Sequence, residues 1–412
     1  MTVPLLPTGR DQRWLAVGNL VNMTGTGATL SALVVFLADA KDLPLGQAAG
    51  LLTAAGLIGV TGAVPLGQLS DRYGARAVAL AGELVGAVTT LLLLVAGGAW
   101  SCALCLAVRQ LAVSGTTAAR ATLMGRLVPA PERAALRAYQ RSVSNIGFSL
   151  GALGAAAAMT WGGTALYVLI AVDAATYLFG AYATTRLPEV GRGVRRAGLA
   201  KDALRDAGYL GASLLNAVHT LNRAVVSLGV PLWIVYATTL PHWTVSAAMI
   251  ANTLLVILLQ IPLSPYAQDI ARSRRSLLAA GLLTAAGCAA LGTADAYDTV
   301  ARLVWPLFAL ACLALALGEI LGAAAGWTLS YELAPEPLLG QYQGVWQLIA
   351  DGSSKAAGPA VIGWALAAGP AGWTALAAVF AATGAVSPPL IRWAGRRHTA
   401  RTAGAGELIA DT

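Results

Sequence analysis

The sequence predicts an all-α membrane protein with 12 transmembrane helices in two six-helix bundles, related by a pseudo-twofold axis along the membrane normal. Hydrophobic residues make up 57% of the 412 residues and charged residues only 11%, whereas a soluble domain carries about 25% charged residues. The apolar residues form runs long enough to cross a bilayer, which takes about 20 residues of helix. The longest polar stretch lies in the middle of the chain, between two sets of such runs.

The apolar runs are rich in alanine and leucine and lack the ten-residue alternation of a membrane β-barrel, so we expect helices. The predicted spans are residues 13–38, 45–67, 75–97, 101–123, 138–160, 164–185, 207–236, 243–264, 276–294, 303–328, 340–367 and 371–394. The four cysteines all fall inside these runs and are interpreted as small buried apolar residues.

The loops between the predicted spans fall into two groups by charge. If the loop at 67–76 is cytoplasmic, nearly all basic loop residues lie on its side, and only Lys41 and Arg302 lie on the other. This asymmetry is the positive-inside signature, so both termini are expected in the cytoplasm. The abundance of arginine, alanine and glycine indicates a bacterial source. We therefore expect a multi-pass protein of the bacterial inner membrane.

The polar stretch at 186–206 is predicted to be a cytoplasmic linker. It separates an N-terminal six-helix bundle, residues 1–185, from a C-terminal six-helix bundle with a short cytoplasmic tail, residues 207–412. An internal duplication would explain this layout, since Asp269 follows the eighth span as Asp71 follows the second. Repeats with an even number of spans share one topology and are related by an axis along the membrane normal.

A charged island of ten residues, GQLSDRYGAR, separates the second predicted span from the third. It resembles the loop 2–3 motif of the major facilitator superfamily, usually Gly-x-Leu-Ala-Asp-Arg-x-Gly-Arg-Arg. The resemblance extends to the length and six-plus-six layout of the whole chain. The residues that it marks as a cytoplasmic gate are Gly67, Asp71, Arg72, Gly74 and Arg76.

The resemblance implies that Asp71 latches the cytoplasmic gate near the start of the eleventh span, with Gly67 allowing close helix contact. The alternative is that Asp71 caps a helix locally or pairs with Arg72 or Arg76. Within the superfamily, the chain resembles the 12-helix drug/proton antiporter group. The glycines from Gly147 to Gly154 are similar to that group's fifth span, although the proline of that motif is missing.

Several ionisable residues fall inside predicted spans, where a charge costs several kcal/mol or more and usually faces a cavity or a partner. Glu319 is the first candidate for proton coupling, because it has apolar neighbours and no basic residue within a turn of its own helix. Asp351 and Asp173 are further candidates. Asp351 is one helical turn from Lys355, so we expect these two to pair. The resemblance places the span of Asp173 outermost, which favours a packing role.

Polar side chains recur at helical spacing in several spans, and the resemblance places some of these spans around a central cavity. The alternative for hydroxyls and amides is hydrogen bonding between helices. The candidates for the substrate cavity are Asn19, Asn22, Arg109, Asn145, Asn216, His219, Arg223, Glu319 and Trp346.

These observations predict a secondary active transporter, with proton-coupled efflux of a hydrophobic or amphipathic small molecule by alternating access. An alternative is uptake or facilitated exchange of a polar solute such as a sugar, and a remote one is a non-transporting scaffold. We expect no enzyme activity, since phosphate-binding, zinc-binding and nucleophile motifs are missing. The expected partners are a small-molecule substrate, protons and the lipid bilayer. We expect a monomer with no cofactor, no metal and no nucleic acid partner.

Overall fold

The computed structural model describes residues 9–161, 163–190, 201–297 and 301–410. These parts of the chain contain helices and turns but no strand. Eleven of the helical segments among them are long and apolar enough to cross a membrane. The all-α membrane class is therefore confirmed.

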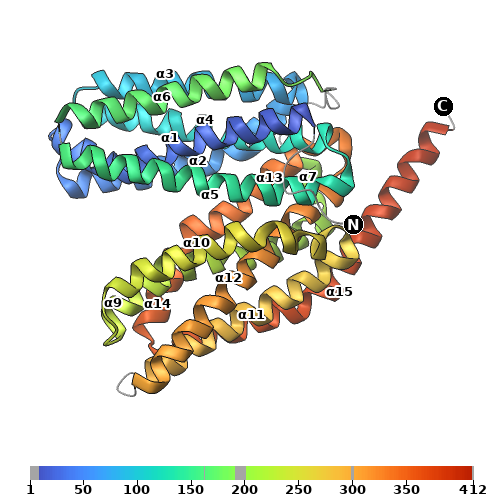
Figure 1. Cartoon of the computed structure of the whole chain (residues 1–412). Helices are drawn as coiled ribbons and strands as arrows, with labels where there is room; N and C mark the ends of the chain where they lie inside the picture. The colour runs from blue at the N-terminus through green and yellow to red at the C-terminus, as the bar shows by residue number, and fades with distance from the viewer. Residues whose placement is uncertain (1–8, 162, 191–200, 298–300, 411–412) are drawn as a thin grey trace. The chain divides into compact units, whose positions relative to one another are not determined.

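In the first half of the chain, the apolar runs form helices close to the predicted spans (Figure 1). The π-helical segment Phe36–Ala40 (η1) continues the first helix. The α-helices are α1 (Arg10–Val35), α2 (Leu45–Tyr73), α3 (Ala75–Val95), α4 (Ala99–Leu127), α5 (Ala130–Trp161), α6 (Gly163–Thr185) and the short α7 (Lys201–Arg205).

The second half is more often interrupted. The seventh predicted span is a helix broken by a π-helical segment, and the eighth ends in a short 3-10 turn. The elements are α8 (Ala207–Ala224), η2 (Val225–Gly229), α9 (Val230–Ala237), α10 (Trp243–Leu263), η3 (Ser264–Ala267), α11 (Ile270–Ala296), α12 (Ala301–Glu332), η4 (Glu336–Leu338), α13 (Leu339–Asp351), η5 (Gly352–Ala357), α14 (Gly358–Ala367) and α15 (Pro370–Ala410).

The predicted span at 340–367 is absent from the eleven membrane-spanning candidates. It folds instead as α13, the π-helical segment η5 and α14. Polar residues such as Gln343, Asp351 and Lys355 lower its hydropathy, and η5 interrupts its regular hydrogen bonding.

Contacts between Cα atoms divide the chain into two compact units. The first comprises residues 1–201 and 336–348, and the second comprises residues 202–335 and 349–412. The predicted boundaries at 185 and 207 stay a prediction, and residues 191–200 of the predicted linker lie outside the described residues. The boundary between the two units also falls inside α13, after Leu348, and no feature of the sequence predicted it.

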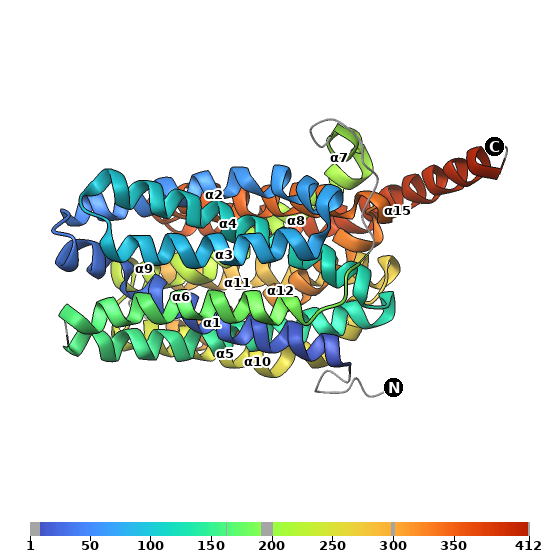
Figure 2. The same ribbon diagram turned by 90° about the horizontal axis from the view of Figure 1, so that it is seen from above.

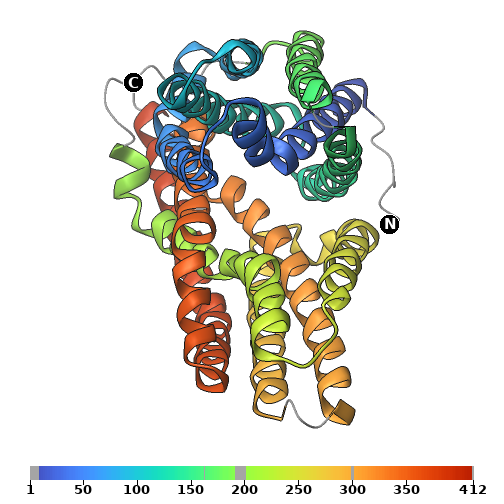
Figure 3. The same ribbon diagram turned by 90° about the vertical axis from the view of Figure 1, so that its left-hand side faces the viewer.

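In the first unit, α1 packs against α5 and α6, α2 against α4, and α3 against α4 and α6. Figure 2 shows α1 beside α5, and in Figure 3 the helices of this unit are seen nearly end-on. The apolar core near one end of these helices includes Phe36, Leu37, Leu106 and Ile170.

The second unit pairs its helices in the same order. Here α8 packs against η5 and α15, α10 against α12, and α11 against α12 and α15. Its core includes Trp233, Phe308, Trp373 and Phe380. Each pairing matches that of the spans six places earlier in the chain, which agrees with an internal duplication.

A single residue, Gly74, connects α2 to α3. Its φ of 98° lies in a region that residues with a side chain rarely adopt. Glycine at this position therefore allows one helix to end and the next to begin without a longer loop, and it places the charged island between two spans.

Candidate functional site

Asp71 lies in the last turn of α2, and its buried carboxylate binds the start of α13 within the first unit. Oδ1 accepts the backbone N–H of Gly340 and Oδ2 accepts that of Gln341, both at 2.9 Å. The first N–H groups of a helix have no partner within the helix, and a negative charge at this end is favoured. Asp71 thus caps the start of α13.

Arg126 of α4 completes this arrangement. Its Nη2 donates to Oδ1 of Asp71 at 2.9 Å, and both side chains are less than a tenth exposed. The carboxylate therefore binds a cation and two helical N–H groups at once. The local pairing of Asp71 with Arg72 or Arg76 is not what the structure has.

Glycines permit this contact between α2 and α13. A Cβ atom on Gly67 would lie 2.3 Å from the carbonyl oxygen of Gly340, and one on Gly344 would lie 2.5 Å from that of Ala63. No side chain fits at such distances, so the two backbones touch directly. Close approach is what brings the carboxylate of Asp71 within reach of the N–H groups of α13.

The other residues of the charged island lie outside this contact. The guanidinium of Arg72 stacks on the ring of Tyr73, 5.1 Å from its centroid. Arg76 donates to the carbonyl oxygen of Thr185 at 2.7 Å, which ties the start of α3 to the end of α6. The contact of Arg76 therefore fixes the turn around Gly74 to α6.

A second group of charges is buried among α3, α4 and α6. Nη2 of Arg109 donates to Oδ2 of Asp173 at 2.8 Å, and both side chains are almost fully buried. Nε of Arg109 donates to Oγ1 of Thr90 at 3.2 Å, and the guanidinium stacks on the ring of Tyr177. Arg109 is thus surrounded by partners from two neighbouring helices.

The neighbouring pair joins α4 to α3. Nη2 of Arg120 lies 2.6 Å from Oε1 of Glu83, whose side chain is fully buried, and Asn22 of α1 donates to Oε2 at 3.4 Å. Gly180 of α6 makes room for this carboxylate, because a Cβ atom there would lie 2.7 Å from Oε2 of Glu83. Two buried acids are therefore matched by two arginines of one helix.

Two of the cavity candidates make contacts between helices of the first unit. Arg109 and Asn22 bind residues of α3 and α6 inside the first unit and are buried. The contact of the Asn22 amide with Glu83 is of the kind that the interhelical alternative for amides describes. Asp173 is likewise held in the pair with Arg109.

In the second unit, the charged residues lie near the middle of their spans. Nε of Arg223, in α8, lies 4.0 Å from Oε1 of Glu319 in α12. The carboxylate side chain is 9% exposed, whereas that of Arg223 is 42% exposed. A guanidinium exposed to lipid at this depth would be costly. This exposure therefore favours a position facing water.

The expected pair of Asp351 and Lys355 is confirmed, with Nζ of Lys355 3.0 Å from Oδ2 of Asp351. The lysine is 64% exposed and lies in η5, and Asp351 directly precedes η5. Arg223 lies two residues before the other π-helical segment of this unit, η2. Such π-helical turns are frequent at functional sites because they redirect side chains within a helix.

Helix α8 is tied to η5 by hydroxyl groups. Oγ of Ser353 donates to the carbonyl oxygen of Ala217 at 2.6 Å. On other faces of α8, Nε2 of His219 lies 3.4 Å from Oγ of Ser387, and Asn216 packs against Gly326 of α12. Both His219 and Asn216 are buried.

The remaining cavity candidates lie in the first unit. Asn19 donates to Oγ of Ser144 at 2.7 Å and to the carbonyl oxygen of Gln140 at 3.1 Å, which joins α1 to α5. Asn145 of α5 is half-buried, and Trp346 of α13 is buried.

Sequence reasoning missed three partners. Arg126 was outside every predicted span, Thr90 was one of many threonines, and Asn222 lacked a charge. Asn222 donates to Oγ1 of Thr284 at 2.7 Å and to the carbonyl oxygen of Leu315 at 3.2 Å, which joins α8 to α11 and α12. The available signal was the spacing of Asn222 from His219, three residues along the same helix.

Residues 15–208 match the family model of the Major Facilitator Superfamily. The structure is similar to that of the Major Facilitator Superfamily transporter FucP in the outward conformation, with a TM-score of 0.71 and 12% sequence identity. That comparison covers 93% of this chain and 99% of the other.

The chain has the major facilitator fold. A bacterial homologue of the iron transporter ferroportin in the outward-facing state has the same fold, with a TM-score of 0.75, 14% identity and coverage of 94% of this chain and 100% of the other. The structure is also similar to that of the proton:xylose symporter XylE bound to 6-bromo-6-deoxy-D-glucose, with a TM-score of 0.67 and 15% sequence identity. That comparison covers 92% of this chain and 94% of the other. No curated protein matches the sequence. Among the described residues, no group of three or more His, Cys, Asp or Glu side chains is placed to hold a metal ion.

Proposed function

We propose that this chain is a secondary active transporter that exports a hydrophobic or amphipathic small molecule in exchange for protons, by alternating access. The observation that carries the proposal is the exposed guanidinium of Arg223 beside the buried carboxylate of Glu319, near the middle of two membrane spans. An ionisable pair at this depth, with one member accessible, is the arrangement that proton coupling needs. The major facilitator fold supports a transporter but leaves cargo and direction open.

In this proposal Glu319 carries the proton. The deprotonated carboxylate attracts Arg223, and protonation removes this attraction, so proton binding changes which groups Arg223 contacts. Asp173 is a weaker candidate, because it is fully buried and hydrogen-bonded to Arg109. We assign the Arg109–Asp173 and Arg120–Glu83 pairs a structural role instead.

The gate role of Asp71 is also part of the proposal. Its support is the cap on α13, whose first residues belong to the first unit and whose last residues belong to the second. Opening and closing of this contact would then accompany the change between transport states. We propose a monomer in a bacterial inner membrane with both termini in the cytoplasm, for which the arrangement of basic loop residues is the support.

Proton-driven flux in proteoliposomes tests the coupling. The Glu319→Gln variant is expected to lose flux driven by a proton gradient, while the Glu332→Gln variant, at the end of the same helix, keeps it. The compounds tested as transported substrates include hydrophobic cations, amphipathic compounds and sugars. Unchanged coupling in Glu319→Gln would remove Glu319 from the mechanism.

A second candidate is uptake or exchange of a polar solute. The exposed cations Arg223 and Lys355 favour it, since they could bind a polar or anionic group. The direction of net flux distinguishes uptake from export. Cells that express the protein accumulate the polar solute if it is an uptake transporter, and they lose the hydrophobic compound if it is an exporter. The scaffold alternative predicts no flux of any tested compound.

A further inference from the structure

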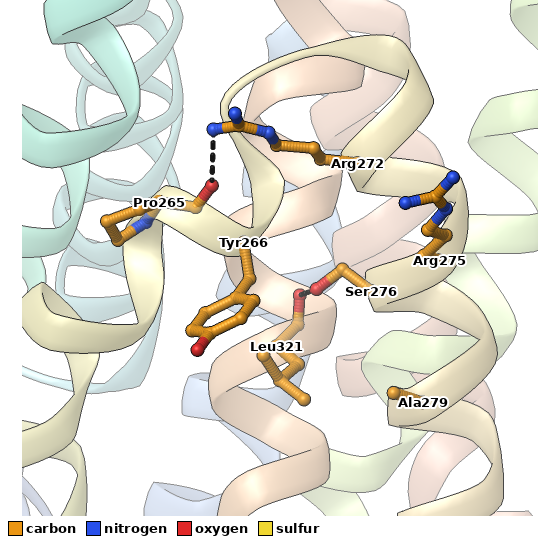
Figure 4. Close-up of a pocket in the computed structure, with 7 residues that line it drawn as sticks. All are labelled: Pro265, Tyr266, Arg272, Arg275, Ser276, Ala279 and Leu321. Carbon is orange, nitrogen blue, oxygen red and sulfur yellow. Dashed lines mark hydrogen bonds between the residues drawn. The ribbon is translucent and has the colours of Figure 1, made fainter.

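A cavity of about 470 Å³ lies in the second unit, where η3 and the first turns of α11 meet α12. This volume is in the range of small-molecule and lipid sites. Figure 4 shows the residues that line it, which are Pro265, Tyr266, Arg272, Arg275, Ser276, Ala279 and Leu321.

One end of the cavity is cationic. Arg272 is held in place, because its Nη1 donates to Oε1 of Gln268 at 2.9 Å and to the carbonyl oxygen of Pro265 at 3.3 Å. Arg275 is exposed, and its guanidinium has no hydrogen-bond or ion-pair partner in the described part of the chain. In Figure 4 the two guanidinium groups point in different directions, that of Arg272 toward Pro265 and that of Arg275 toward the opposite side of α11. The guanidinium of Arg275 is therefore available for an anion, whereas that of Arg272 is paired with Asp269, with Nε 3.4 Å from Oδ2.

The other end is apolar. Ala279 and Leu321 come from facing helices, and the small side chain of Ala279 leaves space beside Leu321. Oγ of Ser276 donates to the carbonyl oxygen of Leu321 at 3.2 Å, which closes the cavity between α11 and α12. Tyr266, which is 64% exposed, also lines the cavity. A ligand of this cavity must have an anionic group and an apolar body.

The cavity lies where two membrane spans end, since the candidate spans Trp243–Ala267 and Ile270–Ala296 are separated by two residues. Ends of spans lie at the depth of lipid phosphate groups. The local charge is positive, because Arg272, Arg274 and Arg275 outnumber Asp269, which caps α11 by accepting the N–H of Arg272. Clustered arginines at this depth bind anionic lipid head groups.

We propose that this cavity is a binding site for an anionic phospholipid. The phosphate binds Arg275, whose planar donors suit phosphate oxygens. The first part of an acyl chain lies along Ala279, Leu321 and the ring of Tyr266. This site is separate from the residues proposed for transport, and the inference does not depend on the transported substrate.

Binding of phosphatidylglycerol to the purified full chain in neutral detergent, measured by native mass spectrometry, tests the site. The wild type is expected to bind phosphatidylglycerol more tightly than phosphatidylcholine. Arg275→Gln is expected to weaken the binding of phosphatidylglycerol about fivefold, the effect of one basic residue near a membrane surface. Arg274→Gln is the matched control, since it removes the same charge from the same helical turn but from outside the cavity, and it is expected to weaken binding clearly less than Arg275→Gln.

The apolar end has its own variant. Ala279→Trp fills the cavity without changing its charge and is expected to abolish the preference for phosphatidylglycerol. Equal binding of the two lipids by the wild type would overturn the proposal, as would equal losses in Arg275→Gln and Arg274→Gln. Competition by inorganic phosphate at the concentration of lipid would also overturn it, since the site would then bind free phosphate. Arg275 is exposed and bonds no described residue, so its variant decides the matter even where Ala279→Trp does not fold.

Discussion

The carboxylate of Asp71 accepts the backbone N–H of Gly340, 269 residues further along the chain, at 2.9 Å. It caps a helix to which it does not belong. Asp269, the corresponding residue of the second half, instead caps its own helix by accepting the N–H of Arg272 at 2.7 Å. The two repeats have therefore diverged at this turn, one with a long-range cap and the other with a local one.

The Asp71→Asn variant tests this difference. The amide can accept only one of the two N–H groups and does not neutralise Arg126, so the cap should weaken by about 1–2 kcal/mol. Hydrogen exchange of the peptide that contains Gly340 and Gln341 is expected to become roughly tenfold faster. Asp269→Asn is the control and should leave this peptide unchanged. Equal acceleration in both variants would contradict a specific cap.

The close contact of α2 with α13 makes Gly67 sensitive to the smallest change. A methyl group in Gly67→Ala would lie 2.3 Å from the carbonyl oxygen of Gly340, so the helices must separate and stability should fall by about 1–3 kcal/mol. A Cβ atom added to Gly56 of the same helix would meet no neighbouring element within 4 Å. Gly56→Ala should therefore leave stability unchanged or raise it by about 0.5–1 kcal/mol. Thermal unfolding in detergent measures both.

The buried pair of Arg109 and Asp173 predicts a strong non-additive effect. Asp173→Asn or Arg109→Gln alone leaves a buried charge without its partner and should destabilise the protein by about 3–5 kcal/mol. The double variant should lose clearly less than the sum of both. Denaturant unfolding of the four proteins in detergent gives the coupling energy. Additive losses would mean that the two side chains do not depend on each other.

Adjacent threonines of α3 allow a sharper test of the same group. Thr90 accepts Nε–H of Arg109, whereas the hydroxyl of Thr89 donates only to carbonyl groups of its own helix. Thr90→Val should cost about 1–3 kcal/mol, because it leaves a buried charged donor without an acceptor. Thr89→Val should cost less than about 1 kcal/mol. Denaturant unfolding in detergent measures both losses. A larger loss of stability in Thr89→Val than in Thr90→Val would contradict the hydrogen bond from Arg109 to Thr90.

Helix positions were predictable from the sequence because each span needs a long apolar run, and the runs are visible residue by residue. The exception is the span at 340–367, whose polar residues coincide with a π-helical segment. The position of Gly74 at the turn was predictable too, since few other residues tolerate its backbone conformation.

Side-chain partners were mostly not predictable. Asp351 and Lys355 are four residues apart, so helical geometry alone brings them together. Arg109 and Asp173 are 64 residues apart, and their meeting depends on how two helices rotate about their axes. The rotation of each helix about its axis cannot be deduced from a single sequence. For the same reason, the sequence does not show which neighbouring helices Asn22 and Arg109 contact.

The division of α13 after Leu348 has a consequence for dissecting the protein. Residues 336–348 come late in the chain but group with the first unit, so the N-terminal half of the sequence does not contain the whole of its compact unit. A fragment that ends before residue 190 lacks the helix that Asp71 caps. If the chain is cut there, the second fragment contains all of its own unit together with α13, and the first fragment needs the second to supply the missing helix.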